Sequence, residues 1–195
     1  MAVSPLAVHT MAETVLGCVC AMLDQTAAEV EGQPGCPCRA CVVPGPPAWD
    51  GCADPCGPAE SVGGQLTVHV ARIYPSSSFP AEDRTVLGTR GCLVPATAVE
   101  LVITLLRCVP TIDEHGCPPT CEELAAAAQI VHVDTASVYN ALLCCLPSTG
   151  TRRRGPQFLM GAHRVLESQG GCGGIEQRVT VALPGCGCPA EEESP

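Results

Sequence analysis

The segment Thr97-Ala-Val-Glu-Leu-Val-Ile-Thr-Leu-Leu-Arg-Cys108 is the most apolar run of the chain. Valine, isoleucine and leucine occupy both of its alternating faces, and Glu100, Thr104 and Arg107 are the exceptions. Such a run is typical of a strand that is buried on both sides of a sheet. We therefore expect a central strand over residues 98–109.

A long helix is predicted to follow this strand. Thr120, with Glu123 three residues later, forms a Thr-x-x-Glu capping box, and the two prolines before it preclude an earlier start. Because the Ala- and Leu-rich sequence continues to Leu146, we expect helix over about 120–146. Asp134-Thr-Ala-Ser137 has the composition of a second N-cap, which leaves open one bent helix or two helices over 121–131 and 135–145.

The rest of the chain predicts an α+β fold with a mainly antiparallel sheet. Apolar residues recur at spacings of three and four over 7–30, which predicts an amphipathic N-terminal helix. Alternating residues predict strands over 65–74 and 175–183. A short strand over 36–43 and a C-terminal hairpin built from 158–166 and 175–183 complete the sheet.

We expect one domain over residues 1–183. It includes a Cys-rich loop at 44–64 and a long loop at 75–95, of the kind that often carries partner contacts. Residues 184–195 form an acidic tail, expected to be mobile.

The composition limits the classes of function. The 195 residues carry a net charge of −10, and all ten positive residues are arginine. This balance argues against binding of nucleic acid through its phosphates. We expect neither a secretory leader nor a membrane span, because no uninterrupted apolar run reaches about 18 residues. Sixteen cysteines are unusual in a reducing compartment. A protein that is made in the cytosol and used outside the cell would fit both the many cysteines and the expected lack of a secretory leader.

Five of the cysteines fall within 21 residues of sequence and form its sharpest local feature: Cys36, Cys38, Cys41, Cys52 and Cys56. Zinc sites commonly use paired Cys-x-x-Cys knuckles, and Cys38 and Cys41 alone have that spacing. A zinc site formed by Cys38, Cys41, Cys52 and Cys56, a set of disulfides, and a cluster of thiols all remain open. Cys18 and Cys20 are expected to be small buried or half-buried residues of the first helix.

Catalytic motifs are absent from the sequence. It contains no Gly-x-Ser-x-Gly, and the glycines at 170–174 stand between two predicted strands rather than before a helix. We therefore predict no catalytic and no cofactor-binding residues, and a protein that is not an enzyme. Zinc is the one cofactor that the cysteines allow.

The strand Val-Glu-Leu-Val-Ile-Thr-Leu-Leu-Arg-Cys at 99–108, the long helix, and the ending formed by 157–166 and 175–183 resemble the neck proteins of long-tailed phages of actinobacteria. Within that group the order of elements looks most like the tail terminators. The resemblance implies a structural virion protein that forms a hexameric ring, caps the tail tube and joins it to the head connector. No functional residue can be transferred by position.

The resemblance also implies where the protein acts and what it meets. It would be made in the host cytoplasm and act in the virion neck, with the tail tube protein and the head–tail connector proteins as partners and no membrane contact. DNA would pass through the lumen without specific binding, which an acidic ring would favour. A stopper or adaptor of the head–tail connection, and a small Cys-rich metal-binding module, are the alternatives.

Overall fold

The computed structural model describes residues 6–47, 62–84, 96–112, 115–148, 157–169 and 171–184. Its elements are α1 (Ala7–Glu29), β1 (Arg39–Val42), β2 (Gln65–Ser76), β3 (Ala96–Cys108), α2 (Cys121–Cys145), the 3₁₀ turn η1 (Leu146–Ser148), β4 (Phe158–Gln169) and β5 (Cys172–Pro184). Two helices and a mostly antiparallel sheet confirm the predicted α+β class, including the C-terminal hairpin. Most of the Cys-rich loop, the end of the long loop and the acidic tail from residue 185 lie outside the described residues.

The sheet has the strand order β1-β2-β3-β5-β4, with β3 at its centre. β3 pairs antiparallel with β2 and β5, while the short β1 pairs parallel with β2 at the edge. Leu101, Ile103 and Leu105 of β3 pack in the core below the sheet, and Val102 on the opposite face is also buried. The prediction of a central strand buried on both faces is therefore confirmed.

Two glycines allow the neighbouring strands to approach β3 closely. A Cβ at Gly174 of β5 would collide with the carbonyl oxygen of Leu105, and a Cβ at Gly64, just before β2, would collide with that of Leu106. Only a residue without a side chain fits at either position. The centre of the sheet is thus fixed from both sides by backbone contacts.

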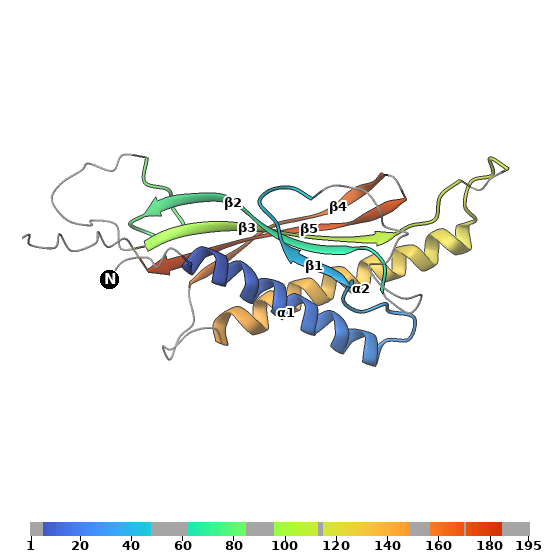
Figure 1. The fold of residues 1–195 in the computed structure, drawn as a ribbon, viewed down its shortest axis with the longest axis horizontal. Helices are drawn as coiled ribbons and strands as arrows, with labels where there is room; N and C mark the ends of the chain where they lie inside the picture. Colours follow the sequence, from blue (N-terminus) through green and yellow to red (C-terminus); the bar gives the residue numbers. More distant parts are fainter. Residues whose placement is uncertain are drawn as a thin grey trace, which may run out of the picture.

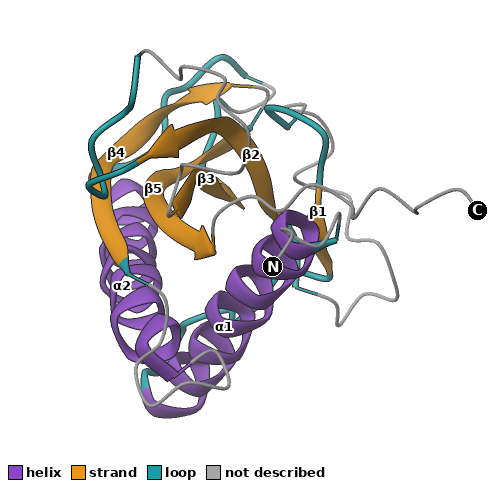
Figure 2. Cartoon of the chain, turned by 90° about the vertical axis from the view of Figure 1, so that its left-hand side faces the viewer, coloured by secondary structure: helices purple, strands orange, loops and turns teal. Residues whose placement is uncertain are grey.

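Both helices cover the same face of the sheet (Figure 1), and Figure 2 shows them side by side below the strands. α1 buries Ala12, Val15, Val19 and Leu23, which recur at helical spacing. By length and composition alone, α1 is also apolar enough to cross a membrane, with a mean hydropathy of 1.2. The core helix of a soluble protein can have the same length and composition, and the buried residues of α1 pack in the core beneath the sheet.

α2 is one continuous helix from Cys121 to Cys145, so the sequence alternative of two helices is not what forms. It begins at the predicted capping box: Glu123 N–H donates to Thr120 Oγ1 at 3.2 Å, and Thr120 N–H donates to Glu123 Oε2 at 2.8 Å. The hydrogen bond from the Thr120 backbone lowers the pKa of the Glu123 carboxyl. Asp134 does not cap a second helix, because its side chain is buried in an ion pair.

Candidate functional site

The predicted cysteine cluster is divided between several environments. Cys36 forms a disulfide with Cys20 of α1, with 5.0 Å between their Cα atoms, and Cys38 is also disulfide-bonded. Cys41 of β1 is an exposed thiol. Cys52 and Cys56 lie outside the described residues. Because a sulfur in a disulfide is not a thiolate ligand, Cys38 does not serve a zinc ion in this state.

Within the described ranges, no group of three or more His, Cys, Asp or Glu side chains is arranged to hold a metal ion. Cys52 and Cys56, the other two predicted zinc ligands of the Cys-rich loop, lie outside the described residues, so the structure does not test them.

A second disulfide joins the two helices. Cys18 of α1 bonds to Cys145 of α2 across 127 residues of sequence, with 6.1 Å between their Cα atoms. Cys18 and Cys20 are half-buried, as expected, and both also form cross-links that the sequence did not predict. The neighbouring Cys144 is exposed. Sequence spacing gave no signal for either pair, because each depends on how α1 lies against other elements.

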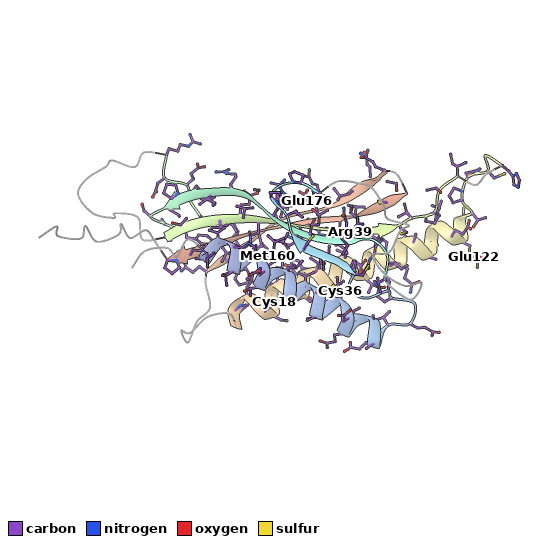
Figure 3. All side chains as sticks on the ribbon, viewed as in Figure 1. Cys18, Cys36, Arg39, Glu122, Met160 and Glu176 are labelled. Atoms are coloured by element: carbon purple, nitrogen blue, oxygen red, sulfur yellow. A yellow bond between two sulfur atoms is a disulfide. The ribbon has the colours of Figure 1, made fainter. Side chains whose placement is uncertain are left out.

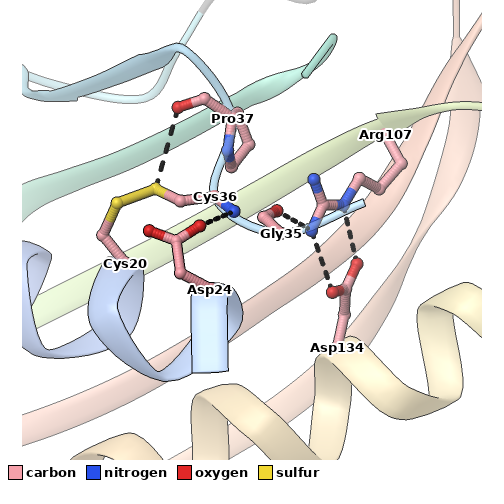
Figure 4. The surroundings of a disulfide bond; sticks show 7 residues. All are labelled: Cys20, Asp24, Gly35, Cys36, Pro37, Arg107 and Asp134. Carbon is pink, nitrogen blue, oxygen red and sulfur yellow. Dashed lines mark hydrogen bonds and ion pairs between the residues drawn. A yellow bond between two sulfur atoms is a disulfide. The ribbon is translucent and has the colours of Figure 1, made fainter. Parts of the chain in front are cut away.

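A buried ion pair lies beside the Cys20–Cys36 disulfide (Figure 4). Arg107 Nε donates to Asp134 Oδ2 at 2.8 Å, and Arg107 Nη2 donates to Asp134 Oδ1 at 2.9 Å and to the carbonyl oxygen of Gly35 at 2.7 Å. The two side chains are only 5% and 1% exposed. This bidentate pair joins β3, α2 and the segment that follows α1.

Two more contacts tie that segment down. Gln33 Nε2 donates to Asp134 Oδ1 at 2.9 Å, and the backbone N–H of Cys36 donates to Asp24 Oδ1 at 2.8 Å. No local sequence pattern predicts this network. The sequence shows only a single arginine near the end of an apolar strand and a single acid beyond the first turn of an apolar helix.

Charges on the sheet face away from the helices are paired across strands. Arg178 of β5 donates to Glu100 of β3 at 2.8 Å and to Glu176 at 3.1 Å, and Arg164 of β4 donates to Glu176 at 2.7 Å. The hydrogen bond with Glu100 raises the pKa of Arg178. This face thus does not account for the strongly negative net charge.

Two polar side chains of β2 are buried on the same face. His69 is 6% exposed and Thr67 is 1% exposed. His69 Nδ1 and Thr67 Oγ1 have no hydrogen-bond partner within the described part of the chain. Burial lowers the pKa of His69, so the neutral imidazole is favoured at this position.

The solvent side of α1 is acidic. Glu13, Asp24, Glu29 and Glu31 are exposed along this helix and just after it, and the first arginine of the chain is Arg39. Asp24 also accepts the hydrogen bond from Cys36, so one of these carboxylates has a structural contact as well. The described N-terminal segment therefore presents a negative surface on one helix.

α2 presents a different surface. Its exposed side carries residues three or four apart that form one row without Asp, Glu or Arg, which we call the α2 stripe: Leu124, Ala128, His132, Ala136, Tyr139 and Leu143. The three large members are between 40% and 49% exposed. Thr135 beside the stripe lies 3.4 Å from His163 Nε2 of β4, and Val165 of β4 is 63% exposed. The exposed side of α2 thus lies next to the outer strand of the sheet, which carries the exposed Val165.

The first half of α2 has no buried residue. All residues buried on this helix lie between Asp134 and Leu142. In Figure 1 the beginning of α2 extends past the ends of the strands, and Figure 3 shows Glu122 at that far end. The helix is therefore attached to the body of the protein through its second half.

A shallow hollow of about 380 Å³ lies where the segment after β2 meets the start of β4. It is lined by Phe79, Pro80, Gln157, Phe158 and Leu159, which include both phenylalanines of the chain. The segment that carries Phe79 is tied back to β2, because Tyr74 donates to the carbonyl oxygen of Pro80 at 3.1 Å and Ser76 donates to that of Ala81 at 2.7 Å. An ordered apolar surface thus lies at this end of the sheet.

Comparison with known protein families and with curated proteins found no match to this chain. The functional conclusion therefore depends on the arrangement of the residues described above. The described surface offers the acidic side of α1, the α2 stripe and a small hollow, and a disulfide joins the two helices.

Proposed function

We propose that this chain is a structural protein of a phage neck: a tail terminator that forms a ring, caps the tail tube and joins it to the head connector. The observation that carries the proposal is the order of elements on one sheet. A first helix, an antiparallel core, a long capped helix and a C-terminal hairpin are the elements that the resemblance implies.

The distribution of charge supports this role. A protein around a DNA channel works best when its lining does not hold the phosphates, and an acidic lining has that property. The exposed carboxylates of α1 form such a surface, and the chain has no lysine. In the proposed ring, α1 therefore faces the lumen.

The disulfides support a protein that acts outside the cell. Disulfides persist in oxidising surroundings and are rare in reducing cytosol. The Cys18–Cys145 and Cys20–Cys36 bonds fasten α1 to α2 and to the segment before β1. A virion protein is made in the cytoplasm and released with the particle, so its thiols can oxidise after release.

The experiment is electron microscopy of the purified chain, alone and after mixing with tail tubes of the phage that encodes it. A tail terminator gives rings, or a cap at one end of each tube with no further growth of the capped end. Binding to the head connector without binding to tubes would instead identify a stopper or adaptor. A chain that forms no ring and binds neither assembly would refute the proposal, and about one bound zinc per chain would then favour a metal-binding module.

A further inference from the structure

We propose that the α2 stripe is the surface through which this chain binds a second copy of itself. The proposal rests on the ring-forming function proposed above and specifies its contact. The stripe consists of Leu124, Ala128, His132, Ala136, Tyr139 and Leu143, and Val165 of β4 extends it. Aromatic and aliphatic side chains in the middle of such a row are the usual anchors of a protein interface.

The first half of α2 is more apolar than its contacts within the described part of the chain require. Residues 124–133 read Leu-Ala-Ala-Ala-Ala-Gln-Ile-Val-His-Val, yet none of them is buried. Val131 packs partly buried against the core, but the exposed side of such a helix is expected to carry charged residues. The capping box at Thr120 and Glu123 forms this end of the helix locally, so its apolar surface remains available for a partner.

The available area fits a specific interface. With 25 residues, α2 is about 37 Å long at about 1.5 Å per residue. The helix is about 11 Å across and the outer strand beside it adds about 5 Å, which gives about 600 Å². Stable protein interfaces use about 800 Å² on each partner.

The charge distribution favours another copy as the occupant. Each chain carries a net charge of −10, so two copies repel each other wherever acidic surfaces meet. The acidic side of α1 is therefore a poor contact surface between copies. The α2 stripe contains no Asp, Glu or Arg, and copies can approach there without bringing like charges together. Because a closed ring needs two different surfaces in contact, the stripe packs on a different part of the neighbouring chain.

Adjacent residues of α2 provide matched variants. Ala128→Glu and Tyr139→Glu place a carboxylate in the stripe, whereas Gln129→Glu and Asn140→Glu place it on the next exposed position, about 100° around the helix. Ala128 and Gln129 are both exposed, so neither change should disturb folding. Circular dichroism of each variant checks this directly.

Sedimentation velocity measures the concentration at which half of the chains are assembled, for the chain alone or on tail tubes if rings close only there. We expect the stripe variants to raise that concentration about a hundredfold or more, because an unpaired charge would be buried in the contact. The two control variants should leave it within about threefold. A photo-reactive phenylalanine at Tyr139 should cross-link to a second copy of the chain.

The outcomes separate this inference from the proposed function. Rings that persist in both stripe variants would overturn the inference and leave the ring-forming function intact. Cross-links from Tyr139 that reach the tail tube protein or a connector, and no second copy, would overturn the choice of occupant. A wild-type chain that stays monomeric even on tail tubes would overturn both.

Discussion

Replacing Asp134 by alanine should destabilise the protein by about 3–5 kcal/mol, because Arg107 would keep a buried charge without a counter-ion. The guanidinium is 5% exposed, and one of its nitrogens, Nη1, already has no hydrogen-bond partner in the described structure. The change also removes an acceptor from Gln33 Nε2. For a chain of this size, such a loss should lower Tm by about 10 °C.

A double variant tests the cause. If the penalty comes from an uncompensated charge, Arg107→Met combined with Asp134→Ala should cost less than Asp134→Ala alone, because no buried charge then remains. Some cost should persist, since the carbonyl oxygen of Gly35 loses its donor. A control is Glu82→Ala, which removes the exposed pair between Glu82 and Arg72 and should leave the unfolding midpoint nearly unchanged.

The assay is urea unfolding followed by circular dichroism, with the disulfides intact and all variants at one protein concentration, because assembly adds to apparent stability. We expect the midpoint of Asp134→Ala to fall by about 1–2 M urea. A loss below about 1 kcal/mol would refute the reasoning, since it would mean that water reaches the pair or that the guanidinium finds another acceptor. A double variant less stable than the single one would refute it as well.

Three further predictions concern local features. In the loop-entropy model, Cys145→Ser should cost about 5 kcal/mol and Cys36→Ser about 3 kcal/mol in thermal unfolding, since the loops span 127 and 16 residues; the reverse order would contradict that model. Hydrogen bonding lowers the pKa of Glu123, so the start of α2 should lose amide-exchange protection as the pH falls below about 4.3 and through that lowered pKa. Glu123→Gln should abolish this pH dependence, and a persistent dependence would assign it to another group. Burial lowers the pKa of His69 in the folded chain. Below about pH 6.5 the unfolded chain therefore binds a proton at His69 more readily than the folded chain does. The free energy of unfolding should fall as the pH drops below about 6.5 and become constant below the lowered pKa. His69→Leu should flatten that slope in urea titrations between about pH 7.5 and pH 5.5, and an unchanged slope would contradict this origin.

Local patterns were sufficient to predict most of the fold. The apolar run around Ile103, the alternation of β2 and the capping box at Thr120 each act over a few residues, and each formed as expected. The structure differs where Asp134 was taken as a possible cap, because a buried arginine 27 residues earlier in the chain changes its role. No local pattern contains that partner.

The α2 stripe was harder to predict from the sequence, because it too depends on contacts between distant parts of the chain. The Ala-rich sequence of α2 has no clear apolar period, so it does not indicate which side faces the sheet. Only the contacts of Val138 and Leu142 with the core define the inner side and leave Tyr139 outside. The disulfide from Cys18 to Cys145 was equally invisible, since it depends on how two distant helices meet.

The contacts that hold α2 in place and the α2 stripe belong to the same helix, and this leads to a last prediction. α2 is held through its second half by the Cys18–Cys145 bond, the Arg107–Asp134 pair and the packing of Leu142, while its first half projects. A surface that is already held in its bound position loses less conformational entropy on association. Asp134→Ala should therefore weaken assembly even at temperatures where the variant is fully folded, although Asp134 is buried and lies outside the stripe. Sedimentation of the folded variant measures this effect, and assembly at the wild-type concentration would show that the frame does not position the stripe.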